Sequence, residues 1–502
     1  MASTTAAASD ALSARSLPAP PVAARLAAMR SRRELRPGLA LAFAFAWGLA
    51  MARLIDVSED GKAMLLFGTT FFVAITFSAF VRPRYYLPLA VAYLPFSKVY
   101  PLPLAGVTGA NMTNFVLALG FVAWAATRVQ GRPSLPTRVA DGLALAYVAV
   151  ASLGLLPAYA ADPDLLDLAL TYRGWLAPMV FYLLTRGLVR NREDVRGILQ
   201  VMAWTTFLVA VATWVEGIDR SSHGSIDAAR VRGLMEQANS MGAFLVYYGL
   251  PLLALAVGAR PLRRALPYFA AFLVVVRATL YTFSRGAYLA LAAGAATVLL
   301  FGSPLLLVAA GGGGAVAAVL FPSLIPESVR ERIDDTTTRS SVYENDGSEV
   351  SLDRSSAHRL VIWRGAARMV AEHPLQGVGL GRFQKMIGYY TEVPLKKTDP
   401  HDAHNAFVLV ASETGLPSLA LLLLLFASWG LLALRLRLRH RHPVDRGLGL
   451  VFMGSLVGVL VSGLLGSRFS DEALVAWFWI LAATVVSASR FRIRPRPSRR
   501  PA

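Results

Sequence analysis

NAFVLVASETGLPSLALLLLLFASWGLLAL, residues 405–434, is a long apolar run in which Glu413 is the only charged residue. A helix that crosses a lipid bilayer needs about 20 mostly apolar residues, so this run predicts a membrane-spanning helix. Similar runs recur along the chain of 502 residues, which is 55% hydrophobic and has a mean hydropathy of +0.50. This composition argues against an ordinary soluble domain and predicts an all-α polytopic membrane protein.

The apolar runs are numerous enough for 12–14 transmembrane helices. Two groups of helices are predicted, at 38–321 and 405–489, with one large loop at 322–404 between them. The short run 85–99 and the tightly spaced pair 287–302 and 304–321 could be re-entrant or broken, which gives the lower count. The predicted spans are 38–55, 62–81, 85–99, 112–128, 139–158, 174–189, 197–215, 240–258, 266–283, 287–302, 304–321, 405–434, 447–466 and 472–489.

Positive charge gathers in three segments of a chain whose net charge is +19. Residues 1–37, 434–446 and 490–502 carry six, five and six arginines against three acids in all. These segments fall on one side of the membrane in the fourteen-span count, which is the positive-inside pattern. We therefore expect cytoplasmic termini, with a disordered basic tail at 1–37 and a second basic tail at 490–502. Anionic lipid explains such tails, so nucleic acid is not expected as a partner.

The chain contains no cysteine, which excludes disulfides, thiolate metal sites and cysteine nucleophiles. The first 37 residues also lack the apolar centre of a signal peptide.

The loop 322–404 is expected to lie outside the cytoplasm, and a long insertion among short connections is where function is expected. Residues 326–353 are predicted to be irregular and exposed. Residues 355–373 are predicted to form a helix that Ser355 or Ser356 caps and Pro374 ends. The following 376–399 begins with QGVGLGRF and is predicted to be mostly irregular; because no strand precedes its glycines, they indicate a tight turn and not a dinucleotide site.

Arg359 is the unusual residue of the predicted helix 355–373. At 100° per residue it lies in the middle of the face formed by apolar side chains, opposite the solvated stripe Arg364, Arg368 and Glu372. Burying a guanidinium costs several kcal/mol unless an anion meets it. Either a buried carboxylate pairs with Arg359, or an anionic ligand does.

The polar segment His401-Asp402-Ala403-His404-Asn405 directly precedes the apolar run 405–434. Asp399 and Pro400 predict a helix start here, with Asp402 in the first turn and His401, His404 and Asn405 on one face. A helix start attracts phosphate oxygens and keeps a nearby histidine neutral. Three interpretations remain open: a base beside an anion site, a metal site of His401, Asp402 and His404, and a simple capping cluster.

Three further arginines stand near the predicted outer boundary of the membrane. Arg285, in SRGAY between two apolar spans, indicates either a functional charge or a side chain that reaches the headgroups. Arg173 in TYRGW and Arg232 in ARVRGLMEQANS are weaker cases of the same kind.

The motifs that these residues belong to resemble the bacterial O-antigen ligase and polymerase superfamily, membrane glycosyltransferases of the GT-C type. The resemblance covers about 170–480 and is strongest in SRGAYLAL, HRLVIWRGAARMVAEHPLQGVGLGRF, HDAHNAFVLVASETGLPS and, more loosely, RGLMEQANSMGAF. The ligase signature is His-Asn, nine residues, Gly, two residues, then Gly, Thr or Tyr. His404, Asn405 and Gly415 match it, whereas Ser418 departs at the last position, so the ligase and polymerase branches stay open.

The resemblance implies a function and a site. It implies an inverting transfer of a glycan from undecaprenyl diphosphate to a hydroxyl of a glycan or lipid A–core acceptor, at the periplasmic face of the bacterial inner membrane, in O-antigen or exopolysaccharide synthesis. It implies that Arg285 and Arg359 hold the lipid diphosphate and that His404 activates the acceptor hydroxyl. His401, Asn405, Arg173 and Arg232 are expected to contribute to substrate binding. No metal ion or other cofactor is implied.

Other classes of protein remain as alternatives. A transporter or flippase for lipid-linked sugars also needs cationic groups, but it should show inverted repeats and charges near the bilayer midplane, and the sequence shows no clear repeat. A protein O-oligosaccharyltransferase would use the same donor. A metal-dependent GT-C enzyme could use Asp162 and Asp164 of the outer loop ADPDLLD.

Overall fold

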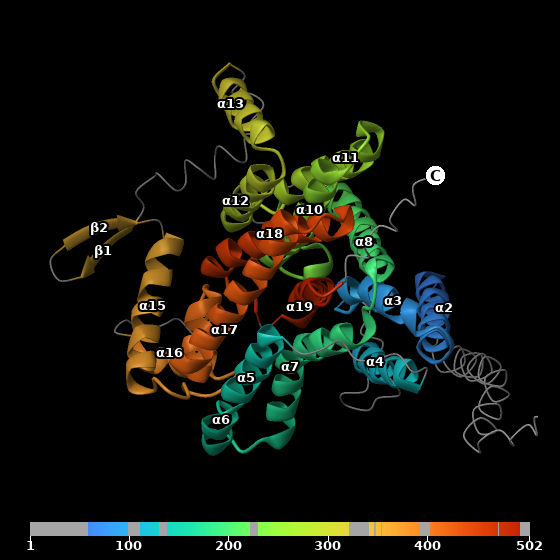
Figure 1. Cartoon of the computed structure of the whole chain (residues 1–502). Coiled ribbons are helices and arrows are strands. Elements are labelled where there is room, and N and C mark those ends of the chain that lie inside the picture. The colour runs from blue at the N-terminus through green and yellow to red at the C-terminus, as the bar shows by residue number, and fades with distance from the viewer. Residues whose placement is uncertain are drawn as a thin grey trace, which may run out of the picture. The chain divides into compact units, whose positions relative to one another are not determined.

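The computed structural model shows a helical protein whose chain divides into two compact units at Arg82 and Pro83. The first unit contributes one described helix, α2 (Glu59–Val81). The second holds all the other described elements (Figure 1). The structure describes residues 59–98, 111–129, 138–220, 229–320, 341–345, 348–352, 354–391, 402–469 and 471–491.

Helices dominate the second unit, in agreement with the predicted fold class. Its elements before the long loop 322–404 are η1 (Pro83–Tyr85), α3 (Tyr86–Tyr93), η2 (Leu94–Phe96), α4 (Met112–Val129), α5 (Val139–Ser152), α6 (Leu155–Ala161), α7 (Leu165–Leu188), α8 (Arg192–Arg220), η3 (Gly233–Met235), α10 (Ala238–Gly258), α11 (Leu262–Leu280), α12 (Arg285–Gly302) and α13 (Pro304–Leu320). The remainder are β1 (Ser341–Asn345), β2 (Ser348–Leu352), α15 (Arg354–Glu372), α16 (Phe383–Tyr390), α17 (Ala406–Arg439), α18 (Pro443–Leu464) and α19 (Glu472–Ala488).

Seven described helices are long and apolar enough to cross a membrane, and three shorter apolar helices accompany them. The chain is therefore an all-α polytopic membrane protein, as predicted. Each predicted span from 62–81 onward coincides with a helix, although α3 within the predicted span 85–99 has only eight residues. Such a helix rises only about 12 Å, too little to cross a bilayer. The predicted span 38–55 lies outside the described residues, so the count of 12–14 stays a prediction.

The centre of the second unit is built around α19, which packs against α7, α10, α17 and α18 (Figure 1). Every residue of α19 from Ala473 to Ala488 is buried, as expected for a helix that is apolar on all sides. The Trp477 indole N–H donates to the carbonyl of Val91 at 2.8 Å, which satisfies its one polar group. In contrast, α8 exposes large apolar side chains such as Trp204 and Leu208, which lipid can cover.

One prediction for the long loop was wrong, and a second was incomplete. Within the predicted irregular region 326–353, β1 and β2 pair as an antiparallel hairpin with Tyr343 opposite Val350. The reason is visible in the sequence, because Asp346-Gly347 is a preferred two-residue hairpin connection between alternating segments. Within 376–399, residues Phe383–Tyr390 form α16. The predicted helix 355–373 is present as α15, and Arg364, Arg368 and Glu372 are exposed as expected. Ala367 was expected on the buried face but is exposed, and Val361 on the opposite side is buried.

The glycine-rich segment after α15 docks against a break in α17. Gly415 has φ +83° and ψ 168° inside that helix, a conformation that is essentially restricted to glycine. The Leu416 N–H donates to the Pro374 carbonyl at 2.8 Å, and the Gly379 N–H donates to the Glu413 carbonyl at 3.1 Å. A Cβ on Gly415 would lie 2.2 Å from the Leu375 carbonyl oxygen. The backbones of Gly415 and Leu375 can therefore approach this closely because Gly415 has no side chain.

Candidate functional site

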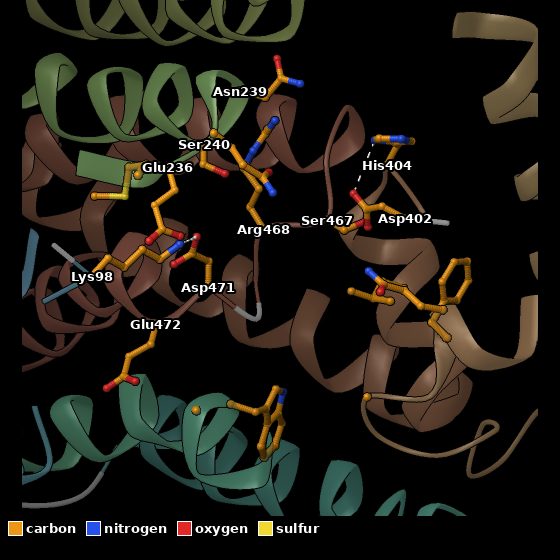
Figure 2. A pocket seen from close by; sticks show the side chains of 18 of the residues that line it. Lys98, Glu236, Asn239, Ser240, Asp402, His404, Ser467, Arg468, Asp471 and Glu472 are labelled. Carbon is orange, nitrogen blue, oxygen red and sulfur yellow. Dashed lines mark hydrogen bonds and ion pairs between the residues drawn. The ribbon is translucent and has the colours of Figure 1, made fainter. Parts of the chain in front are cut away.

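The second unit contains an open cavity of roughly 1100 Å³, lined by polar and apolar groups, between helix ends and connecting segments. Its walls come from parts of the chain that are far apart in sequence, including the segments before α10 and α17, the glycine-rich segment, α7 and the α18–α19 connection. Its charged and histidine residues are Lys98, Arg230, Arg232, Glu236, Asp402, His404, Glu413, Arg468, Asp471 and Glu472 (Figure 2).

His404 is held next to the cavity by an unusual backbone conformation. It has φ +49°, which is uncommon for a residue with a side chain and clusters at functional sites. Its Nδ1 lies 3.4 Å from Oδ2 of Asp402, which also lines the cavity (Figure 2). Asp402 can therefore hold the imidazole in the tautomer whose Nε2 accepts a proton.

The electrostatic environment keeps His404 neutral. Burial lowers the pKa of His404, Asp402 opposes this shift, and the positive charges of Arg359, His358 and Arg468 lower the pKa further. The positive charge of Arg359 thus acts on His404. The dominant effect is removal of the imidazole from water.

Helix α15 brings Arg359 to His404 through Trp363. The Trp363 indole N–H donates to the carbonyl of Ala403 at 2.8 Å, and Ala403 is buried in the apolar cluster that α15 forms with α16. Arg359 precedes Trp363 by four residues and hence lies on the same side of α15. Of the face predicted to be buried, Ile362, Ala366 and Met369 are buried, whereas Arg359 and Trp363 are half-buried.

The helix start predicted at Asp399-Pro400, before α17, was wrong. Residues 402–405 are not helical, and α17 begins at Ala406 with Asn405 as its N-cap. The Asn405 carboxamide oxygen accepts from the N–H groups of Phe407 and Val408 at 2.9 and 3.1 Å. Asn is a strong cap in its own right, and this cap competes with the one expected from Asp399-Pro400. His401, Asp399 and Pro400 lie outside the described residues.

The predicted binding arginines are distributed differently. Arg232 lines the cavity and is exposed there. Arg173 does not line it; its guanidinium donates twice to Oε2 of Glu472, at 2.9 and 3.1 Å. Arg285 does not line it either, although it opens α12 directly after the N-cap Ser284.

The surroundings of α12 nevertheless connect Arg285 to the cavity wall. Arg230, a lining residue, donates from Nε to the Thr282 carbonyl at 3.2 Å and from Nη2 to Asn239 at 2.8 Å. On the other side, a Cβ on Gly286 would lie 3.2 Å from Leu465, just before the α18–α19 connection. Arg285 therefore stands between two segments that supply lining residues.

Three cationic lining residues were not identified from the sequence: Lys98, Arg230 and Arg468. Lys98 is neutralised by a 2.7 Å ion pair with Asp471, whereas the hydrogen bonds of Arg468 within the described part of the chain all go to Ser462. Each stands in a connecting segment whose local pattern is that of an ordinary polar turn, so no sequence signal distinguishes it.

No metal site is evident among the described residues, where no three His, Asp or Glu side chains are grouped to hold an ion. Asp162 and Asp164, the alternative pair of metal ligands, make other contacts. Asp164 caps α7 by accepting from the N–H groups of Leu166 and Asp167. Asp162 pairs with Lys385 at 3.1 Å on the surface.

This geometry defines a polytopic helical membrane protein with a cavity that is lined by His404 and by charged side chains of both signs. Residues 269–423 match the family model described as O-Antigen ligase. This match covers less than a third of the chain; it supports the resemblance to the O-antigen ligase and polymerase family and implies a glycosyltransferase-type enzyme. The match includes Arg285, Arg359 and His404, while Arg230, Arg232 and Arg468 lie outside it. A comparison with curated proteins gave no match.

Proposed function

We propose that this protein is an inverting, GT-C-type glycosyltransferase that moves a glycan from undecaprenyl diphosphate to an acceptor hydroxyl. The acceptor is a second lipid-linked glycan in a polymerase and a lipid A–core sugar in a ligase. The observation that carries the proposal is the shared cavity of His404, Asp402 and several cationic side chains, in a chain with an O-antigen ligase domain.

His404 is the proposed base. The acceptor oxygen attacks the anomeric carbon, the bond from that carbon to the diphosphate oxygen breaks, and the hydroxyl proton passes to Nε2 of His404. The bonding electrons leave with undecaprenyl diphosphate. Asp402, 3.4 Å from Nδ1, orients the ring and stabilises the imidazolium that forms.

Arginine side chains are the proposed diphosphate clamp. A diphosphate is already a competent leaving group, so the protein has to supply positioning and stabilisation of charge. Guanidinium groups match phosphate oxygens and remain charged at any relevant pH. Arg359 and Arg285 are assigned to this role by the resemblance, and Arg232 by its place in the cavity. With this positive charge available, the proposed reaction needs no metal ion.

The proposed orientation places the cavity at the periplasmic face of the bacterial inner membrane. The arginine-rich segments 1–37, 434–446 and 490–502 are assigned to the cytoplasm. The cavity residues His404 and Arg468 stand at the opposite ends of α17 and α18 from the 434–446 segment, which supports a periplasmic location for the chemistry.

The test is glycan transfer by purified protein in proteoliposomes that contain an undecaprenyl-diphosphate glycan and a candidate acceptor. We expect His404→Ala to lower turnover by about 10²–10⁴ and Arg285→Ala or Arg359→Ala to remove about 3 kcal/mol of transition-state stabilisation each. The matched control is Arg364→Ala, which removes an exposed arginine of the same helix as Arg359 and should leave transfer unchanged. Near-normal turnover in all three site variants would end the proposal.

A further inference from the structure

The α18–α19 connection places one arginine, Arg468, in the wall of the cavity. This residue lies outside the O-antigen ligase match at 269–423. Figure 2 shows its side chain between the pair His404–Asp402 and the pair Lys98–Asp471. The negative charges of Asp402 and Asp471 both act on Arg468, which agrees with this central place.

The neighbours of Arg468 fix its position relative to His404. On one side, the Ser467 hydroxyl oxygen accepts from the Asn405 N–H at 3.1 Å. On the other, the ring of Phe469 meets that of Phe407 edge to face, with centroids 5.4 Å apart. The residues before and after Arg468 are thus both attached to the segment that directly follows His404.

The guanidinium itself is held on one side only. Its Nη1 donates to the Ser462 hydroxyl at 3.0 Å and to the Ser462 carbonyl at 3.4 Å. The side chain folds back over Gly466, where a Cβ would lie 2.5 Å from Nη1. Across the described residues, Nε and Nη2 of Arg468 have no hydrogen-bond acceptor and no carboxylate lies within ion-pair distance. These two donors form one edge of the guanidinium fork.

Three other partly buried arginines are neutralised by carboxylates. Arg186 pairs with Asp141 at 2.8 Å, Arg192 with Asp445 at 2.9 Å, and Arg173 with Glu472. Burying a charge without a counter-ion is costly. Arg468 differs from these three arginines because it faces the cavity without a carboxylate partner among the described residues. It is therefore suited to bind an anionic ligand.

We propose that Arg468 binds the diphosphate of the lipid-linked donor through Nε and Nη2, as a residue of the binding site in addition to those that the family resemblance assigns. The assignment rests on the proposed function for the identity of the lipid, whereas the chemistry that it recognises is a diphosphate. Two parallel N–H···O bonds to one phosphate give both affinity and orientation. The Ser462 contacts hold the fork in place before the ligand arrives, which lowers the entropy cost of binding.

The experiment measures binding of undecaprenyl diphosphate to purified protein by titration calorimetry. Arg468→Gln should weaken binding about 10- to 100-fold, as expected for the loss of charge-assisted hydrogen bonds. Arg468→Lys keeps the charge but loses the fork, and it should weaken binding less. Arg437→Gln is the matched control, because Arg437 also donates to backbone carbonyls, those of Phe301 and Gly302, but does not line the cavity. Its affinity should equal that of the wild type.

Two further probes separate the headgroup from the lipid. The affinities for inorganic pyrophosphate should rank the variants in the same order. The affinity for undecaprenol, which lacks phosphate, should be the same for Arg468→Gln and the wild type. The assignment is wrong if the wild type does not bind undecaprenyl diphosphate, if Arg468→Gln binds it as tightly as the wild type, or if Arg437→Gln weakens it equally. Thermal unfolding of each sample checks folding. Should Arg468→Gln not fold, a folded Arg468→Lys with unchanged affinity also overturns the assignment.

The outcome is separable from that of the proposed function. Diphosphate binding that depends on Arg468 in a protein without glycan transfer would sustain this site and refute the proposed reaction. Glycan transfer by the wild type, together with normal diphosphate affinity in Arg468→Gln, would sustain the proposed reaction and refute the assignment of Arg468.

Discussion

Replacement of Gly415 by alanine should detach the glycine-rich segment from α17 and open the cavity wall. The φ of +83° and ψ of 168° at Gly415 are accessible essentially to glycine alone. The added Cβ would also stand 2.2 Å from the Leu375 carbonyl oxygen and 2.4 Å from its carbon. Since this oxygen belongs to rigid backbone, the two segments have to separate by about 1 Å to reach an ordinary contact distance of van der Waals spheres.

The cost can be approximated from the contacts that would be lost. The backbone conformation contributes about 1–3 kcal/mol. Separation also weakens three hydrogen bonds across the contact, from Leu416 to Pro374 at 2.8 Å, from Val378 to Ser412 at 2.8 Å and from Gly379 to Glu413 at 3.1 Å. At about 1 kcal/mol each, the docked state should lose on the order of 4 kcal/mol relative to the open state. The open population then rises by about 10³-fold.

The absence of cysteine in the chain makes this opening measurable with a single introduced thiol. Ser412 is fully buried beneath the docked segment, so Ser412→Cys should react slowly with a maleimide. Adding Gly415→Ala should accelerate this reaction by up to about 10³-fold if local opening limits it. Glycan transfer should fall as well, because Leu380, Gly381 and Phe383 of the docked segment line the cavity.

The control is Gly447→Ala, a glycine of α18 whose added Cβ would meet nothing within 4 Å. It should leave both labelling and transfer unchanged, since an unstrained helical alanine is tolerated. Slow labelling and normal transfer in the Gly415→Ala protein would refute the proposed docking role.

The remaining predictions concern the cavity. Asp402→Asn removes the charge that raises the pKa of His404. Because neutral His404 is the proposed base, the acid limb of the kcat/KM profile should move to lower pH. A shift to higher pH, or no shift, would contradict the pairing of His404 with Asp402. Trp363→Phe loses the 2.8 Å bond to the Ala403 carbonyl and should cost about 1–3 kcal/mol of stability together with reduced transfer, which unfolding and turnover measurements on one sample would check. Treatment with a chelator should leave turnover unchanged, whereas loss of activity that added Mg²⁺ or Mn²⁺ restores would contradict a metal-independent reaction.

The helices were predictable because their signal is local. Any run of about 20 apolar residues has to be helical in a bilayer, since backbone groups find no other partners there. The run 472–489 predicts α19 for this reason, and the structure adds that this helix is central. The phase of Arg359 on α15 was predictable in the same way, because helical periodicity assigns each residue to a face.

Helix starts and short strands were harder, because neighbouring signals compete. Asp399-Pro400 and Asn405 are both acceptable helix starts, and the structure uses Asn405, whose backbone N–H also donates to Ser467. The hairpin of β1 and β2 was missed although Asp346-Gly347 is a turn signal, since strongly polar flanking residues suggested an irregular loop.

The cavity itself could not be predicted from the residues alone. Arg468 stands in a short connection, GSRFSD, where an arginine is usually solvated and needs no explanation. Its burial against Ser462 and its approach to His404 depend on how α17, α18 and α19 pack. Arg173 shows the opposite case: its place near the membrane boundary suggested ligand binding, and the packing of α7 on α19 provides Glu472 as its partner.

The most direct measurement is an experimental structure of the protein in lipid nanodiscs with undecaprenyl diphosphate bound. We expect density for the diphosphate inside the cavity, within hydrogen-bond distance of Arg468 and on the side facing His404. A diphosphate bound elsewhere on the protein, with this cavity filled by solvent or lipid tails, would contradict it.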